Sequence, residues 1–336
     1  VSPVLLALQL GGATAVAIGG AVACIVYCIF GFIFMKIDVN HIYKVLPKVL
    51  IGSITVVIGI TLMSFIPSYI GDTGNVGMFI ALITVLTIAF VSHYCKGALA
   101  LFPFLIGTLV GYVISIPFGL VNFSVFEGIS LFTLPDLGFL HWTNIDVSIL
   151  PNIIILFVAF TVSAICECLS DHAVLGNIIG VDLYRKPGLG RIFIGEGLAN
   201  LVGASSGQLA QCSYGESLST IGFSKCGSVY STLGCALFMI ALGFIEPVQA
   251  FVASIPSCVI GGGTAMVLYG FIANSGIRTL QSVDFSNQKN LIISSVVMSL
   301  GISGVVIGTD TFHLSGTALA LIVGIILNFV LKEKNN

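Results

Sequence analysis

Long apolar segments alternate with short polar ones along the whole chain of 336 residues. The apolar runs exceed the roughly 9 to 11 residues of a transmembrane β-strand and lack period-two alternation, so they predict helices that cross a membrane. Such spans are expected at about residues 1–10, 14–34, 49–66, 76–94, 99–116, 152–175, 192–202, 214–223, 228–245, 259–275, 291–307 and 317–331. The pattern therefore predicts an all-α polytopic membrane protein.

One polar stretch of small residues, 205–219, interrupts this pattern at a depth where hydrocarbon is expected. Non-helical backbone is tolerated there only where protein or a water-filled cavity surrounds it, so such a break usually lines a binding site. The stretch also contains a carboxylate, Glu216. A charge inside a bilayer costs a few kcal/mol or more, and it is seldom kept without a use.

Composition supports the membrane interpretation and excludes several classes of function. Hydrophobic residues make up 57% of the chain and charged residues 8%, whereas soluble domains carry about 25% charged residues. We expect no nucleic-acid partner for such a chain. The nine cysteines lack paired spacing and accompanying histidines, so we expect no metal site. With no nucleophile constellation either, we expect no catalytic residue and no enzyme activity.

The positive charges give the orientation of the chain. When the spans are alternated across the membrane, with the broken stretch and its helix counted as one crossing, all twelve Lys and Arg residues fall on one side, which the positive-inside rule makes the cytoplasm. These residues are Lys36, Lys44, Lys48, Lys96, Arg185, Lys186, Arg191, Lys225, Arg278, Lys289, Lys332 and Lys334. The C-terminus is then cytoplasmic, and the protein is expected in the cell membrane, plasma or inner.

A short motif occurs twice, at 47–55 and at 256–264, an offset of 209 residues. The first copy starts on the cytoplasmic side and the second on the opposite side, so the two halves are expected to be inverted in the membrane. The offset implies that roughly 60 residues, enough for two and a half spans, precede Val1. We therefore expect a fragment of a protein with about fourteen crossings in two repeats of seven.

Acidic residues within or close to the spans are candidates for chemistry. Glu167 and Asp171 are four residues apart on one predicted helix face, with His172 adjacent. Two ionised carboxylates there would repel, so at least one is expected to hold a proton near neutral pH, as a proton-coupled carrier requires. The alternative is a polar pair that only packs helices together. Glu196, five residues from Arg191, is interpreted as structural or interfacial.

Glu216 is predicted to lie in the first turn of a short helix, where free backbone N–H groups and the positive end of the helix dipole converge. Carboxylates at Glu167 and Glu216 accept hydrogen bonds, and the N–H groups of Gly215 and Glu216 donate them. Together they suit a flat, neutral ligand that offers both N–H and C=O, on which Tyr214 could stack. The alternative for Glu216 is an ordinary helix-start glutamate.

Four segments carry a resemblance to a known family: ECLSDH at 167–172, DLYRKPGL at 182–189, YGE at 214–216 and YGFIANSGIR at 269–278. Together they resemble the nucleobase/ascorbate transporter family, and most closely its bacterial uracil permeases. The resemblance covers essentially the whole chain and implies an N-terminally truncated member. It implies fourteen spans in an inverted 7+7 repeat, core and gate domains, and discontinuous spans with short strands.

Carried over to this chain, the resemblance makes 1–35 and 153–245 the two parts of the core domain, the latter with the substrate site, and 36–152 and 246–336 the two parts of the gate. It implies substrate binding by Glu167, Tyr214, Gly215 and Glu216, and proton coupling through Asp171, Glu167 and Glu216. The proton is the coupling ion and no cofactor is expected. Besides the nucleobase and membrane lipid, a homodimer through the gate domain is an expected partner.

The chain also departs from the family signature. Serine stands at Ser217, Ser219 and Ser224, where the family has Asn, Gly and Thr, and 210–213 lacks the usual Pro-Asn-Thr-Thr. The leading prediction is a proton-coupled nucleobase importer, most simply for uracil. A purine permease of the xanthine type and an anion carrier of the sulfate or bicarbonate type remain alternatives, although two carboxylates would repel an anion.

Overall fold

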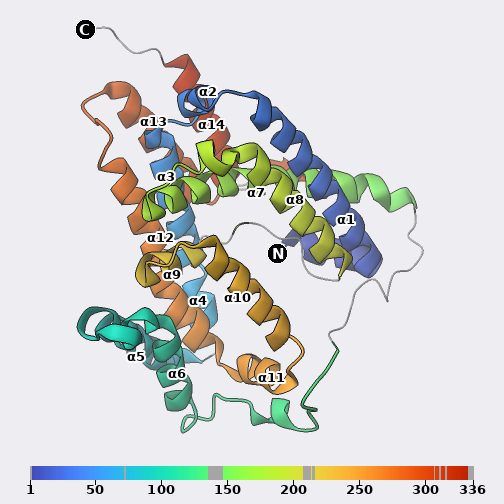
Figure 1. Ribbon diagram of the computed structural model, residues 1–336, viewed down its shortest axis with the longest axis vertical. Coiled ribbons are helices and arrows are strands. Elements are labelled where there is room, and N and C mark those ends of the chain that lie inside the picture. Colours follow the sequence, from blue (N-terminus) through green and yellow to red (C-terminus); the bar gives the residue numbers. More distant parts are fainter. Residues whose placement is uncertain are drawn as a thin grey trace. The chain divides into compact units, whose positions relative to one another are not determined.

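The computed structural model describes residues 2–71, 73–134, 147–206, 213, 216–305, 307–309, 312–314 and 316–331, and it is predominantly helical (Figure 1). Its α-helices are α1 (Ser2–Lys36), α2 (Val39–Val45), α3 (Lys48–Met63), α4 (Ile66–Gly71), α5 (Gly74–Tyr94), α6 (Pro103–Ser115), α7 (Leu150–Ile179), α8 (Leu189–Ser205), α9 (Glu216–Ser224), α10 (Val229–Leu242), α11 (Glu246–Ser254), α12 (Ala265–Leu280), α13 (Gln288–Ile302) and α14 (Gly316–Val330). The described residues also form short 3-10 turns, η1 (Gly97–Leu101), η2 (Phe123–Phe126) and η4 (Val147–Ile149), and π-helical turns, η5 (Tyr184–Gly188) and η6 (Cys258–Thr264).

Several of these helices can cross a membrane. Within the described residues, five segments are long and apolar enough for a full span, and the pair α10 and α11, bent by 98°, makes a sixth if it is one span. The break predicted between 1–10 and 14–34 lies inside α1, where Gly11 and Gly12 leave helical geometry and Gly12 has a φ of 63°. Glycine adopts that conformation without a steric cost. The prediction of a helical, polytopic membrane protein is confirmed.

One predicted span ends earlier than expected. The span at 291–307 stops at Ile302, and Gly304, with a φ of 69°, ends the helix. Strand β1 (Ile307–Thr309) follows and pairs antiparallel with β2 (Phe312–Leu314), with Gly308 opposite His313. The β-branched residues Ile307 and Thr309 favour this extended backbone. The short strand expected in the broken stretch falls mostly on residues outside the described part of the chain.

Contacts divide the chain into two compact units. The first comprises Val1–Ile58, Asp136–Gly215 and Ala273–Asn336, and the second comprises Gly59–Pro135 and Glu216–Ile272. These bounds differ from those of the predicted core (1–35 and 153–245) and gate (36–152 and 246–336). Core and gate are defined by movement during transport rather than by contacts, so that division stays a prediction.

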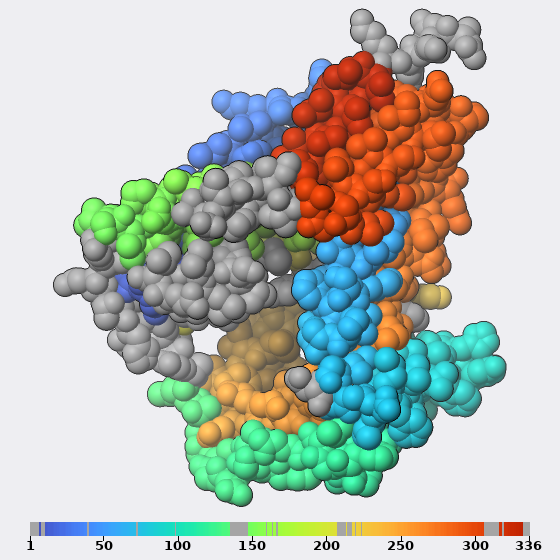
Figure 2. Space-filling model, turned by 180° about the vertical axis from the view of Figure 1, so that it is seen from behind, coloured from blue at the N-terminus to red at the C-terminus, as the bar shows by residue number. Residues whose placement is uncertain are grey.

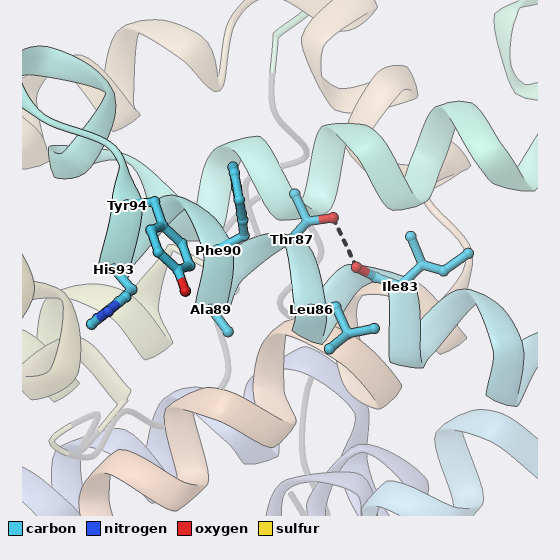
Figure 3. Close-up of a pocket in the computed structure, with 7 residues that line it drawn as sticks. All are labelled: Ile83, Leu86, Thr87, Ala89, Phe90, His93 and Tyr94. Carbon is cyan, nitrogen blue, oxygen red and sulfur yellow. Dashed lines mark hydrogen bonds between the residues drawn. The ribbon is translucent and has the colours of Figure 1, made fainter.

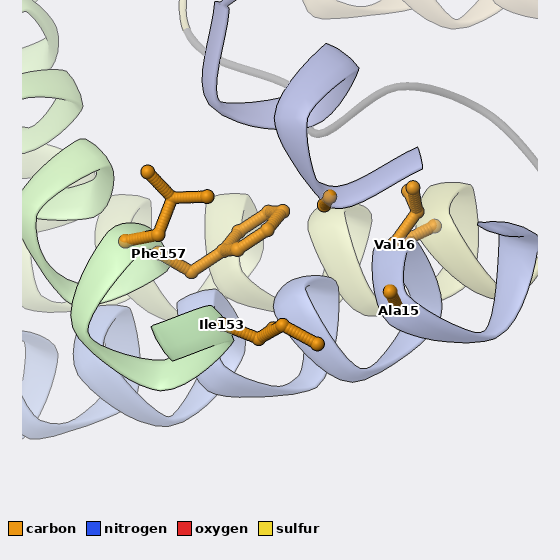
Figure 4. Close-up of a cluster of buried hydrophobic side chains, with 7 residues drawn as sticks. Ala15, Val16, Ile153 and Phe157 are labelled. Carbon is orange, nitrogen blue, oxygen red and sulfur yellow. The ribbon is translucent and has the colours of Figure 1, made fainter. Parts of the chain in front are cut away.

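The first unit is built on the close crossing of α1 and α8. Glycines allow this approach: an added Cβ at Gly20 would lie 2.2 Å from the Cβ of Ala204, and one at Gly197 would lie 2.9 Å from the Cβ of Tyr27. Small residues at such crossings are typical of membrane helices, because they let backbones come into van der Waals contact. Beside this crossing, Val16, Ile153 and Phe157 form a buried apolar cluster between α1 and α7 (Figure 4).

Substituting a glycine at this crossing should destabilise the protein. Gly20→Leu forces the bulk of a side chain into the backbone of α8, and overpacking of this kind costs about 1–3 kcal/mol or more. We expect a lower melting temperature of the purified protein in detergent. Gly195→Leu is the matched control, since nothing lies within 4 Å of a Cβ at Gly195. Equal melting temperatures for the two variants would contradict the role given to the crossing.

The second unit is organised around η6, which packs on α4, α5 and α6. A Cβ at Gly261 would overlap the ring of Tyr69, and one at Gly263 would lie 2.6 Å from Thr84. Figure 2 shows the neighbourhood of η2 (green) alongside α11 (orange) in this unit, and α14 (red) against α13 (orange) in the other.

The two copies of the repeated motif have related surroundings. α2 and α11 each end two residues before a proline, Pro47 or Pro256, that precedes a helix with tightly packed glycines. The equivalent threonines each hydrogen-bond a hydroxyl on another helix: Thr55 lies 2.7 Å from Ser170, and Thr264 lies 2.8 Å from Thr108. These likenesses favour the repeat, and the complete 7+7 inverted architecture stays a prediction.

Candidate functional site

Helix α7 carries the two carboxylates that the sequence singles out. Glu167 and Asp171 lie one turn apart in its second half, as predicted. Asp171 is buried, with 6% of its surface exposed, and Glu167 is half-buried. A buried acidic residue in an apolar helix is costly, because the charged form loses its hydration. The pair is therefore the strongest candidate for a functional site in the described part of α7.

Neighbouring residues hold this turn of α7 in place. Thr55 of α3 donates to the carbonyl of Ile51 at 2.9 Å, so its single hydroxyl proton is used and Ser170 donates to Thr55 at 2.7 Å. On the other side, Tyr184 donates its hydroxyl to the carbonyl of Leu169 at 2.6 Å. Two hydrogen bonds thus position the residues immediately before Asp171.

His172 has a defined orientation beside this pair. Its Nδ1 lies 2.8 Å from the carbonyl oxygen of Cys168 and 3.4 Å from the sulfur of the same residue. A carbonyl only accepts, so Nδ1 carries the proton, and in the neutral ring Nε2 is then an acceptor. From the sequence, His172 was noted only because it is adjacent to Asp171, and its hydrogen bond to Cys168 was not predicted.

Glu196 has a more direct relation to the broken stretch than the sequence suggested. Its Oε1 accepts a hydrogen bond from the hydroxyl of Ser213 at 3.1 Å, and Ser213 directly precedes Tyr214. Glu196 was interpreted as structural or interfacial because Arg191 is five residues away, and that interpretation stays a prediction to which the contact with Ser213 is added. The sequence feature that could have indicated this role is the position of Glu196 in the middle of α8, a helix rich in glycine and alanine.

This contact gives a testable expectation for the stretch. Ser213→Ala removes a hydrogen bond to a carboxylate and loosens the backbone next to Tyr214, so the KM for transport should rise by about three- to tenfold. Ser224→Ala, at the last residue of α9, is a matched control, because among the described residues the hydrogen bonds of Ser224 join it to its near neighbours Ile221 and Cys226. An unchanged KM in Ser213→Ala would show that the contact does not position the stretch.

The second part of the predicted site is described only in part. Tyr214 and Gly215 lie outside the described residues, as does the side chain of Glu216. Helix α9 begins at Glu216, which agrees with the predicted short helix after the break. α7 and α9 belong to different units, so the predicted facing of Glu167 and Glu216 across one pocket stays a prediction.

A shallow depression on α5 is a different kind of surface (Figure 3). Its lining is almost entirely apolar. The hydroxyl of Thr87 donates a hydrogen bond to the carbonyl of Ile83 at 2.8 Å, within the same helix. Phe90 and Tyr94 expose most of their rings near Lys96, an arrangement typical of the aromatic belt at a membrane interface. Without a carboxylate in its lining, this depression is suited to lipid rather than to a polar ligand.

Fold and site together show a helical protein with several segments that can span a membrane and a carboxylate pair inside one of them. The family described as "Permease family" matches residues 4–309. A uracil permease of Bacillus caldolyticus is 33% identical over 98% of this chain and 78% of its own length. One of Escherichia coli K12 is 33% identical over 99% of this chain and 77% of its own. A putative pyrimidine permease of Escherichia coli K12, RutG, is 28% identical over 95% of this chain and 72% of its own.

The chain belongs to this permease family. The resemblance to the nucleobase transporters, and to the uracil permeases among them, is thereby confirmed. As a permease it moves a solute across a membrane and is not an enzyme.

Proposed function

We propose that this protein imports uracil together with protons by alternating access of its core against its gate. The observation that carries this proposal is the pair on α7, where buried Asp171 lies one turn from half-buried Glu167. Relatives named uracil permeases, similar over nearly the whole chain, support the choice of substrate.

The substrate site is proposed to consist of Glu167, Tyr214, Gly215 and Glu216. Uracil is flat and neutral and offers N–H donors as well as carbonyl acceptors. The two glutamates would accept its N–H groups, the backbone N–H groups of Gly215 and Glu216 would donate to a carbonyl, and Tyr214 would stack on the ring. Glu196 would act indirectly, through its hydrogen bond with Ser213.

Proton coupling is proposed to use Asp171, with Glu167 and Glu216 as partners. Two carboxylates one helical turn apart share their titration, because ionising both brings like charges together. When a ligand N–H donates to Glu167, the ionised form of that glutamate is favoured, and the proton is then held by Asp171. Substrate binding and proton binding are linked in this way.

The remaining proposals concern the whole molecule. Residues 36–152 and 246–336 would move as the gate against a core made of 1–35 and 153–245, around a fixed site. The segregation of the positive charges favours a cytoplasmic C-terminus in a cell membrane. A homodimer formed through the gate domain is proposed as the assembled form.

Direct uptake distinguishes the candidate substrates. Proteoliposomes of the full-length protein would be given radiolabelled uracil, xanthine or sulfate with and without an inward proton gradient. We expect gradient-dependent uracil accumulation and no sulfate uptake, because Glu167 and Glu216 repel an anion. Preferential xanthine uptake would support the purine alternative instead, and uptake that ignores the proton gradient would contradict symport.

A further inference from the structure

Side chains from α2 and from the loop between α7 and α8 form a hydrogen-bonded cluster that the transport chemistry above does not use. Asp182 is its centre: Oδ1 accepts from the hydroxyl of Tyr43 at 2.6 Å and from the backbone N–H of Tyr184 at 3.1 Å. Its Oδ2 lies 3.2 Å from Nε of Arg185. We call Tyr43, Asp182, Tyr184 and Arg185 the α2–loop cluster.

The cluster reaches the turn of α7 that holds the carboxylates. The rings of Tyr43 and Tyr184 stack, with centroids 5.6 Å apart and planes 17° apart. Tyr184 is almost fully buried and donates its hydroxyl to the carbonyl of Leu169, a residue between Glu167 and Asp171. A continuous series of contacts therefore runs from α2 to the proposed proton and substrate site.

The donors of the cluster keep their protons under physiological conditions. Burial, followed by the hydrogen bond to Asp182, raises the pKa of Tyr43 to about 12. Burial likewise raises the pKa of Tyr184. A tyrosine with a raised pKa stabilises the fold fully below its unfolded value of about 10, and this contribution is lost only as pH rises further. The tyrosine donors therefore do not lose their protons when the carboxylates of α7 titrate.

The position of the α2–loop cluster determines in which arrangement of core and gate its contacts can form. Under the proposed function, on which this inference rests, Tyr43 lies in the gate (36–152), whereas Asp182 and α7 lie in the core (153–245). Lys44 and Arg185 place the contact on the predicted cytoplasmic side. A contact between core and gate on that side can persist only while the substrate path is closed to the cytoplasm, since opening separates the two.

We propose that Tyr43 and Asp182 are positioning residues that favour the arrangement of this transporter closed to the cytoplasm. Loss of their hydrogen bond shifts the equilibrium toward the arrangement open to the cytoplasm. Fewer molecules then present the site to the outside, and the apparent affinity for external substrate falls by the same fraction. For a partly exposed hydrogen bond to a carboxylate, we expect a shift of about three- to tenfold.

The test compares two measurements on the same full-length variants. Tyr43→Phe keeps the stacked ring and removes only the hydroxyl, so it should raise the KM for uracil uptake from outside by about three- to tenfold. Uracil affinity of the detergent-solubilised protein, whose site is reachable from both sides, should stay within about twofold of the unaltered value. Asp182→Asn keeps the acceptor for Tyr43 and should have a smaller effect than Asp182→Ala.

Tyr230→Phe is the matched control, because Tyr230 is 86% exposed on α10, and it should leave both measurements unchanged. The proposal would be overturned by a Tyr43→Phe protein with unchanged uptake KM, or by equal losses in uptake KM and solubilised affinity, which would mean local damage to the site. Absence of uracil uptake by the unaltered protein would contradict the proposed function instead, and the same comparison with xanthine would then decide the role of the cluster.

Discussion

Glu167→Gln is expected to lower the affinity for uracil by at least about a hundredfold, because a carboxylate that accepts from ligand N–H groups makes charge-assisted hydrogen bonds. The amide that replaces it has one acceptor oxygen, and its NH2 group opposes a ligand donor. Because this position on α7 is half-buried, part of the group stays out of solvent. Both net uptake and exchange should be lost together.

Equilibrium binding of labelled uracil to the purified protein measures this loss directly. Glu127→Gln is the control, since Glu127 is exposed and lies outside the predicted spans. The expected outcome is unchanged binding in Glu127→Gln and no saturable binding in Glu167→Gln at concentrations that saturate the unaltered protein. Binding of normal affinity in a folded Glu167→Gln protein would remove this residue from the proposed site.

Asp171→Asn is expected to separate transport from accumulation. The amide nearly matches the carboxyl in shape within its buried position, so substrate binding should be retained. It cannot take up or release a proton near neutral pH, so uptake against a concentration gradient should be lost while exchange of internal for external uracil continues. The predicted ratio of accumulated to external uracil falls to about one, as for any uncoupled carrier.

Proteoliposomes with an imposed proton gradient, with and without a protonophore, provide the measurement. Asp284→Asn is the control, because Asp284 is exposed in the loop before α13, where Ser286 donates to its carboxylate. If Asp171→Asn still accumulated uracil in a protonophore-sensitive manner, the coupling proton would be held elsewhere, with Glu216 the next candidate.

The candidate site divides into a part that the sequence predicted and a part that it did not. Glu167 and Asp171 were predictable because an acidic residue inside an apolar helix is conspicuous, and a spacing of four sets them on one face. The hydrogen bond from Ser213 to Glu196 was not predictable in the same way. It joins two positions 17 residues apart, and no periodic pattern of polar residues relates a position inside a helix to a residue outside it.

The strand pair β1 and β2 gives a similar lesson for the fold. Hydropathy alone continued the predicted span to 307, since Val305 and Val306 are as apolar as the residues of α13. Gly304 ends the helix through a positive φ, and β-branched residues then favour pairing with a neighbouring strand. Hydropathy shows where a segment is apolar, but it does not distinguish a helix from a short β-strand that follows it.

The sequence by itself determined the class of this protein, the location of most spans, the break at Gly11 and Gly12 and the carboxylates of α7. These properties are local, since each depends on the composition and spacing of one segment. Only the tertiary structure decided that Ser170 hydrogen-bonds Thr55 and that Gly20 packs against Ala204. It also decided that Tyr43 and Tyr184 link α2 to α7. Such contacts depend on the rotation and register of helices distant in sequence, which many weak packing interactions settle together.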